Sequence, residues 1–216
     1  MSNKEKIAKR AAREILDGSS VVVGIGMPTL ILKYIDVNRN VFIHSENGIL
    51  GMGLPSQRGK EDRNLIDAGG AYVTLKKGAS FFDSVQSFTL VRGGRLNMAF
   101  LGALEVSKSG DLANWIIPGK YSPGIGGGME IAQKARRLIV VTTHTDRKGN
   151  PKILNECTLP LTAKACISTI ITELGVFDIL QEGLILREIS NETDIGTVLS
   201  KTEAEVIVPS GDLPTF

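Results

Sequence analysis

Short runs of β-branched residues alternate with segments of helical spacing along almost the whole chain, and this alternation constrains the fold most. The runs are apolar throughout and lack the polar residue at every second position that a strand with one wet face would show. We expect strands at 21–23, 41–43, 72–75, 96–101, 138–142, 176–179, 184–188 and 205–208. Strands that are buried on both faces and separated by helices are typical of layered α/β proteins. The sequence therefore predicts an α/β fold with an open, mostly parallel β-sheet flanked by helices.

The segments between these strands show helical spacing or the residues that begin and end helices. The first, 7–16, carries apolar side chains three and four residues apart, and Gly18 follows as a residue suited to end a helix. Pro28 suits the first turn of the next helix. The further helices are expected at 29–35, 81–91, 129–135, 164–173 and 194–201.

One polar segment interrupts this alternation. Residues 51–64 contain Pro55 and Gly59, and we expect them to form a loop. No linker of convincing length divides the chain, so residues 1–216 are expected to form a single domain.

Glycine and positive charge are concentrated in the same part of the chain. Of the 24 glycines, 20 lie in residues 1–150, and this segment holds 21 Lys and Arg against 13 Asp and Glu, a net charge of +8. Residues 151–216 hold 4 basic and 10 acidic residues, a net charge of −6. A glycine-rich cationic segment can bind a small polyanion, although a dipolar surface without a ligand accounts for the charges equally well. Basic runs with interleaved aromatic residues are lacking, which argues against nucleic acid as a partner.

Several common sites and locations are excluded by simple counts. Cys157 and Cys166 are too few and too far apart for a thiolate metal site, and two reduced thiols indicate a cytoplasmic protein. Only two histidines occur, without an HExxH motif, so no metal site is expected. No apolar run is long enough to span a membrane. The N-terminal residues lack an apolar block after their charges, so no secretory signal is expected, and Glu5, Glu14 and Asp17 argue against a mitochondrial transit peptide.

Two catalytic motifs fail in detail. Gly24-Ile25-Gly26 follows a strand, as in a dinucleotide-binding turn, but Thr29 stands where a third glycine belongs. The GxSxG motif of serine hydrolases is also absent from the sequence. The chemistry that remains is that of carboxylates and backbone N–H groups.

Glu46 is the candidate nucleophile. The strand at 41–43 ends in Ser45-Glu46-Asn47-Gly48, and ligands of open α/β sheets bind beyond the carboxyl ends of strands. A glutamate is ionised at pH 7, because its reference pKa is about 4.3. Carboxylates form covalent intermediates in enzymes. On spacing alone, a polar turn in which Asn47-Gly48 supplies a positive φ is an equally simple interpretation.

A glycine cluster at 124–128 precedes the helix expected at 129–135. Backbone N–H groups in such a cluster can bind a developing oxyanion, and glycine lets the backbone approach closely. A flexible loop or a tight turn is the alternative for this segment when it is considered alone.

Taken together, these residues resemble the β subunit of two-subunit 3-oxoacid coenzyme A (CoA) transferases of family I, of the acetate/acetoacetate or succinyl-CoA type. The resemblance covers essentially the whole chain, and its motifs occur in the same order. They are 24–29 (GIGMPT), 45–48 (SENG), 50–53 (LGMG), 68–69 (AG), 78–80 (GAS), 82–83 (FD), 87–88 (SF), 92–94 (RGG), 110–120 (GDLANWIIPGK), 123–129 (PGIGGGM) and 157–162 (CTLPLT).

The resemblance implies a layered fold of that family and a ping-pong transfer of CoA between an acyl-CoA and a short-chain carboxylic or 3-oxo acid. It implies that Glu46 is the nucleophile, which carries a glutamyl-CoA thioester, and that Gly127 lends its N–H to an oxyanion hole. The residues that it places at substrate or CoA are Gly24, Gly26, Asn47, Gly124, Gly126 and Lys120. Lys120 would meet a CoA phosphate, or else is a solvated loop lysine.

The same resemblance implies a partner and needs no cofactor. An α subunit would supply part of the pocket, in an α2β2 assembly, and CoA would be a substrate while no metal or redox cofactor takes part. An acyl-CoA hydrolase that uses the same glutamate, and a non-catalytic ligand-binding relative on the same fold, are the alternatives.

Some positions depart from the family pattern. Glu130 stands in place of an aspartate, and Lys76-Lys77 replace an apolar residue and a proline. Residues 55–63 and 142–150 also differ, which leaves the acyl specificity open. His44 either supports the turn at Glu46 or is an ordinary residue at the end of a strand.

Overall fold

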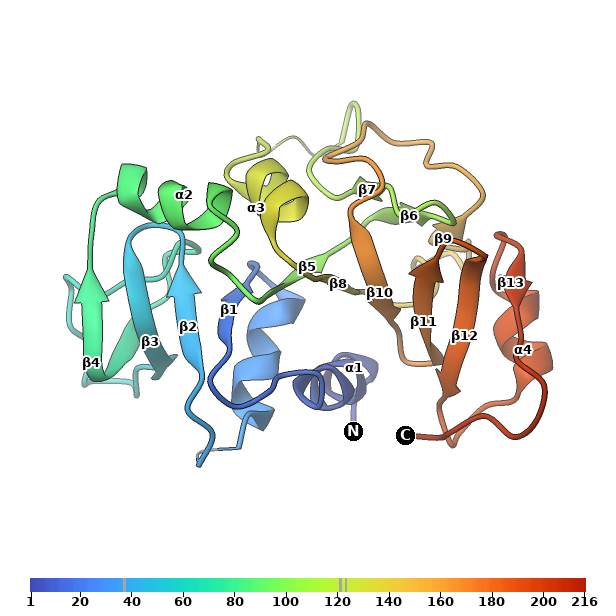
Figure 1. Cartoon of the computed structure of the whole chain (residues 1–216), viewed down its shortest axis with the longest axis horizontal. Helices are drawn as coiled ribbons and strands as arrows, with labels where there is room; N and C mark the ends of the chain where they lie inside the picture. Colours follow the sequence, from blue (N-terminus) through green and yellow to red (C-terminus); the bar gives the residue numbers. More distant parts are fainter. Residues whose placement is uncertain (37, 121, 123) are drawn as a thin grey trace.

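A ten-stranded sheet forms the centre of the computed structural model, which describes every residue except Val37, Tyr121 and Pro123. Figure 1 shows the strands in a row from β4 to β13, with α2 and α3 above them. Across the sheet the order is β13 (Val206–Ile207), β12 (Gly183–Ile189), β11 (Gly175–Leu180), β10 (Ile167–Ile171), β8 (Leu138–Val141), β5 (Met98–Gly102), β1 (Ser20–Val23), β2 (Phe42–Ser45), β3 (Ile49–Pro55) and β4 (Val73–Phe81).

The middle of the sheet is parallel, as predicted. Strands β2, β1, β5, β8 and β10 all run in one direction, and their registers are regular except for a bulge in β10. Antiparallel pairs β2–β3, β3–β4, β10–β11 and β11–β12 extend the sheet at both ends. The parallel part buries both faces, which explains why its strands are apolar throughout.

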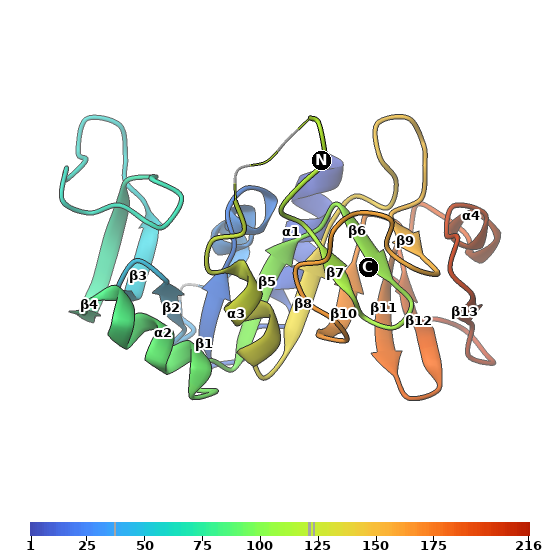
Figure 2. The same cartoon turned by 90° about the horizontal axis from the view of Figure 1, so that it is seen from above.

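Alternate residues of each central strand face two separate cores. In β5, Met98 and Phe100 pack in one core, and Ala99 and Leu101 pack in the other. The first core is covered by α1 (Asn3–Ala12) and the 3-10 helix η1 (Met27–Tyr34), and the second by α2 (Ser84–Arg92) and α3 (Gly128–Lys134). Figure 2 shows these two groups of helices on opposite sides of the sheet.

Helices α1, α2 and α4 begin at residues whose side chains cap them. The Ser2 side chain and Glu5 form a reciprocal capping box at α1, which ends earlier than the predicted 7–16 segment. Asp83 accepts a hydrogen bond from the Gln86 N–H at 2.8 Å and so caps α2. Asp194 caps α4 (Ile195–Ser200) in the same way, with the Thr197 N–H at 2.8 Å.

The predicted helix at 164–173 is wrong, because Ile167–Ile171 form strand β10. The isoleucines of this segment are β-branched, which disfavours a helix and favours a strand. Ile170 and Ile171 lie beside Val140 and Val141 of β8 in a parallel register and are completely buried. Long-range pairing therefore decides the structure of this segment.

The loop predicted at 51–64 is wrong in its first part, since β3 runs to Pro55 between β2 and β4. A Cβ atom at Gly53 would lie 2.4 Å from Thr74 Oγ1, so glycine allows the two strands to approach. Strand β4 is longer than the predicted 72–75, and α2 consequently starts at Ser84 instead of residue 81.

A small second sheet was not predicted. It consists of β7 (Leu112–Ala113), β6 (Glu105–Ser107) and β9 (Ile153–Leu154), and its buried residues join the core beneath α3. Two- and three-residue strands carry too few side chains to show a period. No helix in the described part of the chain is long and apolar enough to cross a bilayer.

Candidate active site

Glu46 lies at the carboxyl edge of the parallel strands, in the turn that joins β2 to β3. The Gly48 N–H closes this turn by donating to the Ser45 carbonyl oxygen at 3.0 Å. Gly48 has φ +116°, and a Cβ atom there would lie 1.9 Å from the Phe82 carbonyl oxygen. The glycine is therefore required both for the backbone conformation and for the approach of β4, and the turn holds Glu46 rigidly.

Gly24 lies at the same edge of the sheet as Glu46. The parallel register of β1 and β2 pairs Val22 with His44, so both strands end at this edge. The Gly24 N–H donates to the Phe100 carbonyl oxygen at 2.8 Å, and a Cβ atom at this position would lie 2.9 Å from Leu101 Cδ2. A side chain at this position would push against β5.

Gly26 is placed differently. It has φ +87°, and a Cβ atom there would meet no atom within 4 Å. Its carbonyl oxygen accepts hydrogen bonds from both the N–H and the hydroxyl of Thr29, which start η1. Gly26 therefore forms the turn that leads into η1, and the space beside it is open.

Gly127 is in direct contact with Glu46. It is the residue before α3, and a Cβ atom at Gly127 would lie 2.8 Å from Glu46 Oε2 and 2.5 Å from Phe88 Cζ. The Gly127 backbone is therefore held between the carboxylate and the Phe88 ring. Glu46 and Gly127, which are distant in the sequence, thus lie side by side in the structure.

The Glu46 carboxylate is half-buried and has no ion-pair partner among the described residues. Burial raises its pKa, and the Gly127 backbone N–H opposes this shift by stabilising the charged form. A desolvated carboxylate without a cation keeps its electron pairs available, which suits a nucleophile.

The other predicted site residues are less closely tied to Glu46. Asn47 is exposed and donates from its side-chain amide to the Ile66 carbonyl oxygen at 2.8 Å, so it fastens the 66–71 loop to the turn. Gly124 has φ +95° and Gly126 has φ +55°, both with open space where a Cβ atom would be. Pro123, predicted as the start of this cluster, lies outside the described residues.

Lys120 is exposed, and its backbone N–H donates to the Ile117 carbonyl oxygen at 3.0 Å. Its side chain makes no hydrogen bond or ion pair within the described part of the chain. The structure thus leaves Lys120 accessible but does not bring it to Glu46.

Two further contacts around the site were not predicted. Phe88, on α2, supports Gly127, and Arg92 of the same helix forms an ion pair with Glu130 of α3 at 2.7 Å. Together they hold the two helices at a fixed separation. Phe88 and Arg92 are each part of a motif quoted above, but their partners are distant in the chain and no sequence spacing links them.

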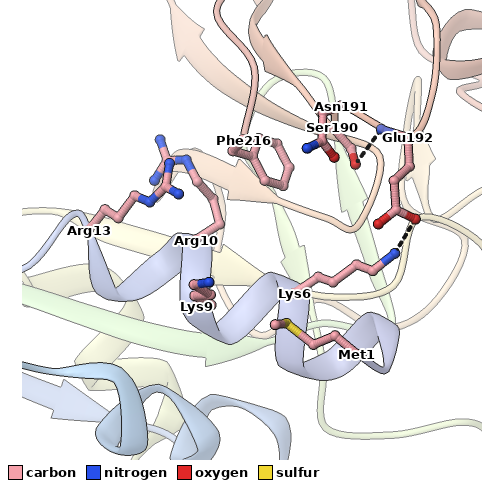
Figure 3. A pocket seen from close by; sticks show the side chains of 9 residues that line it. All are labelled: Met1, Lys6, Lys9, Arg10, Arg13, Ser190, Asn191, Glu192 and Phe216. Atoms are coloured by element: carbon pink, nitrogen blue, oxygen red, sulfur yellow. Dashed lines mark hydrogen bonds and ion pairs between the residues drawn. The ribbon is translucent and has the colours of Figure 1, made fainter.

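The two best-defined hollows of the surface lie away from Glu46. One, of about 180 Å³, is formed between α1, the 190–192 segment and Phe216, and Figure 3 shows Arg10 and Arg13 at one end of it and Lys6 paired with Glu192 at the other. The second, of about 450 Å³, lies beside Arg137 and Arg187. Neither hollow includes a predicted site residue.

Several exposed apolar side chains lie at the same edge of the sheet as Glu46, and we call them the apolar rim. Ile25 follows Gly24, Val85 and Met129 lie in the first turns of α2 and α3, and Phe81 ends β4. Their exposed fractions are 69% for Ile25, 69% for Val85, 60% for Phe81, 40% for Ile66 and 40% for Met129. Such a surface beside a half-buried carboxylate is typical of a site completed by another chain.

Known proteins resemble this chain over nearly its whole length. The sequence model of the family described as "Coenzyme A transferase" matches residues 4–200. A protein of Bacillus subtilis named "Probable coenzyme A transferase subunit beta" is 47% identical over 214 residues, which cover 99% of this chain and 97% of that protein. The acetate CoA-transferase subunit beta of Haemophilus influenzae is 43% identical over 208 residues, covering 96% of this chain and 93% of the relative.

The fold is also shared with a solved structure. An acyl-CoA transferase from Escherichia coli O157:H7 superimposes with a TM-score of 0.78 at 21% identity. The match covers all of this chain but only 43% of that longer chain. The sequence matches and the shared layered α/β fold agree, and the chain belongs to the coenzyme A transferase family.

Proposed function

We propose that this chain is the nucleophile-bearing β subunit of an enzyme that transfers CoA between an acyl-CoA and a short-chain carboxylic or 3-oxo acid. The observation that carries the proposal is the contact between the half-buried Glu46 carboxylate and the Gly127 backbone, at the carboxyl edge of a parallel sheet. The names of its relatives support the class of reaction, and the acids that these names give remain properties of those proteins.

The proposed route uses Glu46 twice. A carboxylate oxygen attacks the thioester carbonyl of the acyl-CoA, which gives a mixed anhydride and releases the CoA thiolate. The thiolate then attacks the Glu46 carbonyl carbon, which gives a glutamyl-CoA thioester and releases the first acid as its carboxylate. A second carboxylate reverses these two steps and leaves as its CoA ester, so that no electron or proton is gained or lost overall. The route as written needs no metal or redox cofactor.

The geometry indicates which of these steps Gly127 would assist. The Gly127 backbone lies against Glu46 and its N–H stabilises the charged carboxylate, so we propose that it also stabilises the oxyanion that forms when the thiolate attacks the glutamyl carbonyl. Gly24, Gly26, Gly124 and Gly126 leave space along the same edge, and we propose that CoA and substrate bind there, with Asn47 and Lys120 at its margin.

We also propose that the apolar rim is covered by an α subunit in an α2β2 assembly. The rim exposes large apolar side chains beside Glu46, and such patches mark sites of protein association. The relatives are named as β subunits, which supports a partner of this kind. We propose the cytoplasm as the compartment, since Cys157 and Cys166 are free thiols.

Trapping of the covalent intermediate tests the proposal. The chain, produced together with its α subunit, is incubated with acetyl-CoA or acetoacetyl-CoA alone and then treated with borohydride or hydroxylamine. We expect a modified peptide that contains Glu46, and none in Glu46→Gln. Release of CoA that needs an acid acceptor supports the transferase, whereas equal release in water alone would establish the hydrolase. Binding of acyl-CoA without any adduct would show a non-catalytic relative.

A further inference from the structure

His44 lies in the interior between strand β2 and helix α2, two residues before Glu46. Its side chain is 1% exposed, and Nε2 is 3.0 Å from the hydroxyl of Ser87, which is completely buried. The imidazole also stacks on Phe82, with ring centroids 6.0 Å apart. The pair therefore joins the strand that carries Glu46 to the helix that lies above it.

The surroundings of the imidazole favour its neutral form. Burial lowers the pKa of His44 to about 4, and Nδ1 is buried with no hydrogen-bond partner among the described residues. A neutral ring can bond Ser87 in either tautomer, since Nε2 can donate to the hydroxyl or accept from it. The contact that the structure shows for this ring is therefore the one with Ser87.

The helix that Ser87 anchors is the one that supports Gly127. Phe88 is the next residue, and its Cζ atom would lie 2.5 Å from a Cβ atom at Gly127. One turn later, Arg92 lies over the Phe88 ring, with Cζ 5.7 Å from the centroid, and pairs with Glu130 of α3. His44 of β2 thus contacts α2, α2 contacts α3, and Gly127 at the start of α3 contacts Glu46.

We propose that the His44–Ser87 hydrogen bond is a positioning pair, which fixes α2 so that Phe88 holds the Gly127 N–H against the Glu46 carboxylate. This inference rests on the proposed function of Glu46. A shift of α2 would move Phe88, and the Gly127 backbone would follow it away from the nucleophile. Misplacement by about 1 Å can lower a rate by about a hundredfold.

Single-turnover kinetics of the holoenzyme with acyl-CoA separate this role from a merely structural one. Quenching at successive times measures the rate constant and the amplitude of glutamyl-thioester formation. In Ser87→Ala and His44→Leu we expect the rate constant to fall by about ten- to a hundredfold, with the amplitude and the KM for acyl-CoA close to those of the wild type. His44→Gln retains a group that can bond Ser87 and should stay within about threefold of the wild-type rate constant.

Ser84→Ala is the matched control, because it makes the same change at an exposed position of the same helix. Its rate constant should equal that of the wild type. An unchanged rate constant in Ser87→Ala, or a loss of amplitude alone, would overturn the positioning role. If the wild type itself forms no thioester on Glu46, the proposed function fails instead, so the two failures are distinguishable.

Discussion

Two largely buried glutamates at opposite edges of the sheet have opposite surroundings. Glu14 follows α1 near the amino edge, and its side chain is 11% exposed. Three arginines bind it, with Arg10 at 2.8 Å, Arg137 at 2.7 Å and Arg187 at 2.5 Å. Glu46, at the carboxyl edge, meets no cation among the residues that the structure describes and lies against the Gly127 backbone.

The pKa values of the two carboxyl groups shift in opposite directions. Burial alone would raise the pKa of Glu14, but the charges and hydrogen bonds of Arg187, Arg10 and Arg137 outweigh it and lower the pKa. At Glu46 burial raises the pKa and the single N–H offsets only part of the shift. The paired carboxylate holds α1 to the sheet, whereas the unpaired one keeps its lone pairs free. Burial by itself therefore does not distinguish a structural glutamate from a reactive one, and the partners do.

Glu46→Gln should have the largest effect on activity and very little on the fold. Loss of a nucleophile typically lowers kcat by about 10⁴-fold or more. The folded state should be as stable as the wild type or slightly more stable, since a desolvated charge is removed without breaking an ion pair. Steady-state transferase assays and thermal unfolding of the complex measure both properties.

The control for this variant is Glu61→Gln, which makes the same change at an exposed position outside the site. It should leave kcat and Tm unchanged. A Glu46→Gln enzyme that retained a tenth of the wild-type kcat would show that the unpaired carboxylate is not the nucleophile, and the contrast with Glu14 would lose its meaning.

Gly127→Ala should have the next largest effect. The new methyl group would lie 2.8 Å from Glu46 Oε2 and 2.5 Å from Phe88 Cζ, so the backbone must move away from the carboxylate. Loss of one oxyanion donor lowers kcat by about 10²- to 10³-fold. Gly149→Ala tests a positive φ, here +88°, outside the site and without such contacts, and it should lower stability but spare kcat. Equal kcat losses in the two variants would contradict the assignment of the donor to Gly127.

Glu14→Gln should reverse the pattern seen at Glu46. Removing one partner of a buried ion pair leaves an uncompensated charge and lowers the free energy of unfolding by about 3 kcal/mol. We expect a lower Tm, with kcat per folded complex unchanged, because the arginines lie away from the site. Denaturant unfolding combined with active-site titration measures the two quantities. An unchanged free energy of unfolding would show that the ion pairs of Glu14 with the three arginines do not stabilise the fold.

The sequence predicted the parallel centre of the sheet because short apolar runs of β-branched residues are typical of strands that are buried on both faces. It also predicted the turn at Glu46, whose Asn47-Gly48 pair follows a strand directly. These features depend on neighbouring residues. The strand β10 was predicted as a helix because its pairing with β8 involves residues far away in the chain.

The site shows the same limit. The contact of Gly127 with Glu46 was expected only through the resemblance, since no spacing connects residues in different layers. The Phe88 support and the three arginines around Glu14 were not predicted at all. Each arises from packing of segments that only the folded topology brings together. The sequence could therefore predict a candidate reactive residue such as Glu46, but not the residues from other segments that surround it.

The smallest expected effect is a difference in the pH dependence of stability. Glu14 has a lowered pKa in the folded state, so its stabilisation is present above the unfolded value of about 4.3 and is lost as the pH falls through the folded pKa. Glu46 has a raised pKa, so its contribution is present below about 4.3 and is lost as the pH rises through the folded value. The Tm gap between wild type and Glu14→Gln should therefore close as the pH falls below about 4.3 and through the folded pKa of Glu14. As the pH rises above about 4.3 and through the folded pKa of Glu46, Glu46→Gln should instead gain in Tm relative to the wild type. Parallel Tm curves for the two variants from pH 3 to 8 would show that the surroundings of the two glutamates do not differ as their contacts indicate.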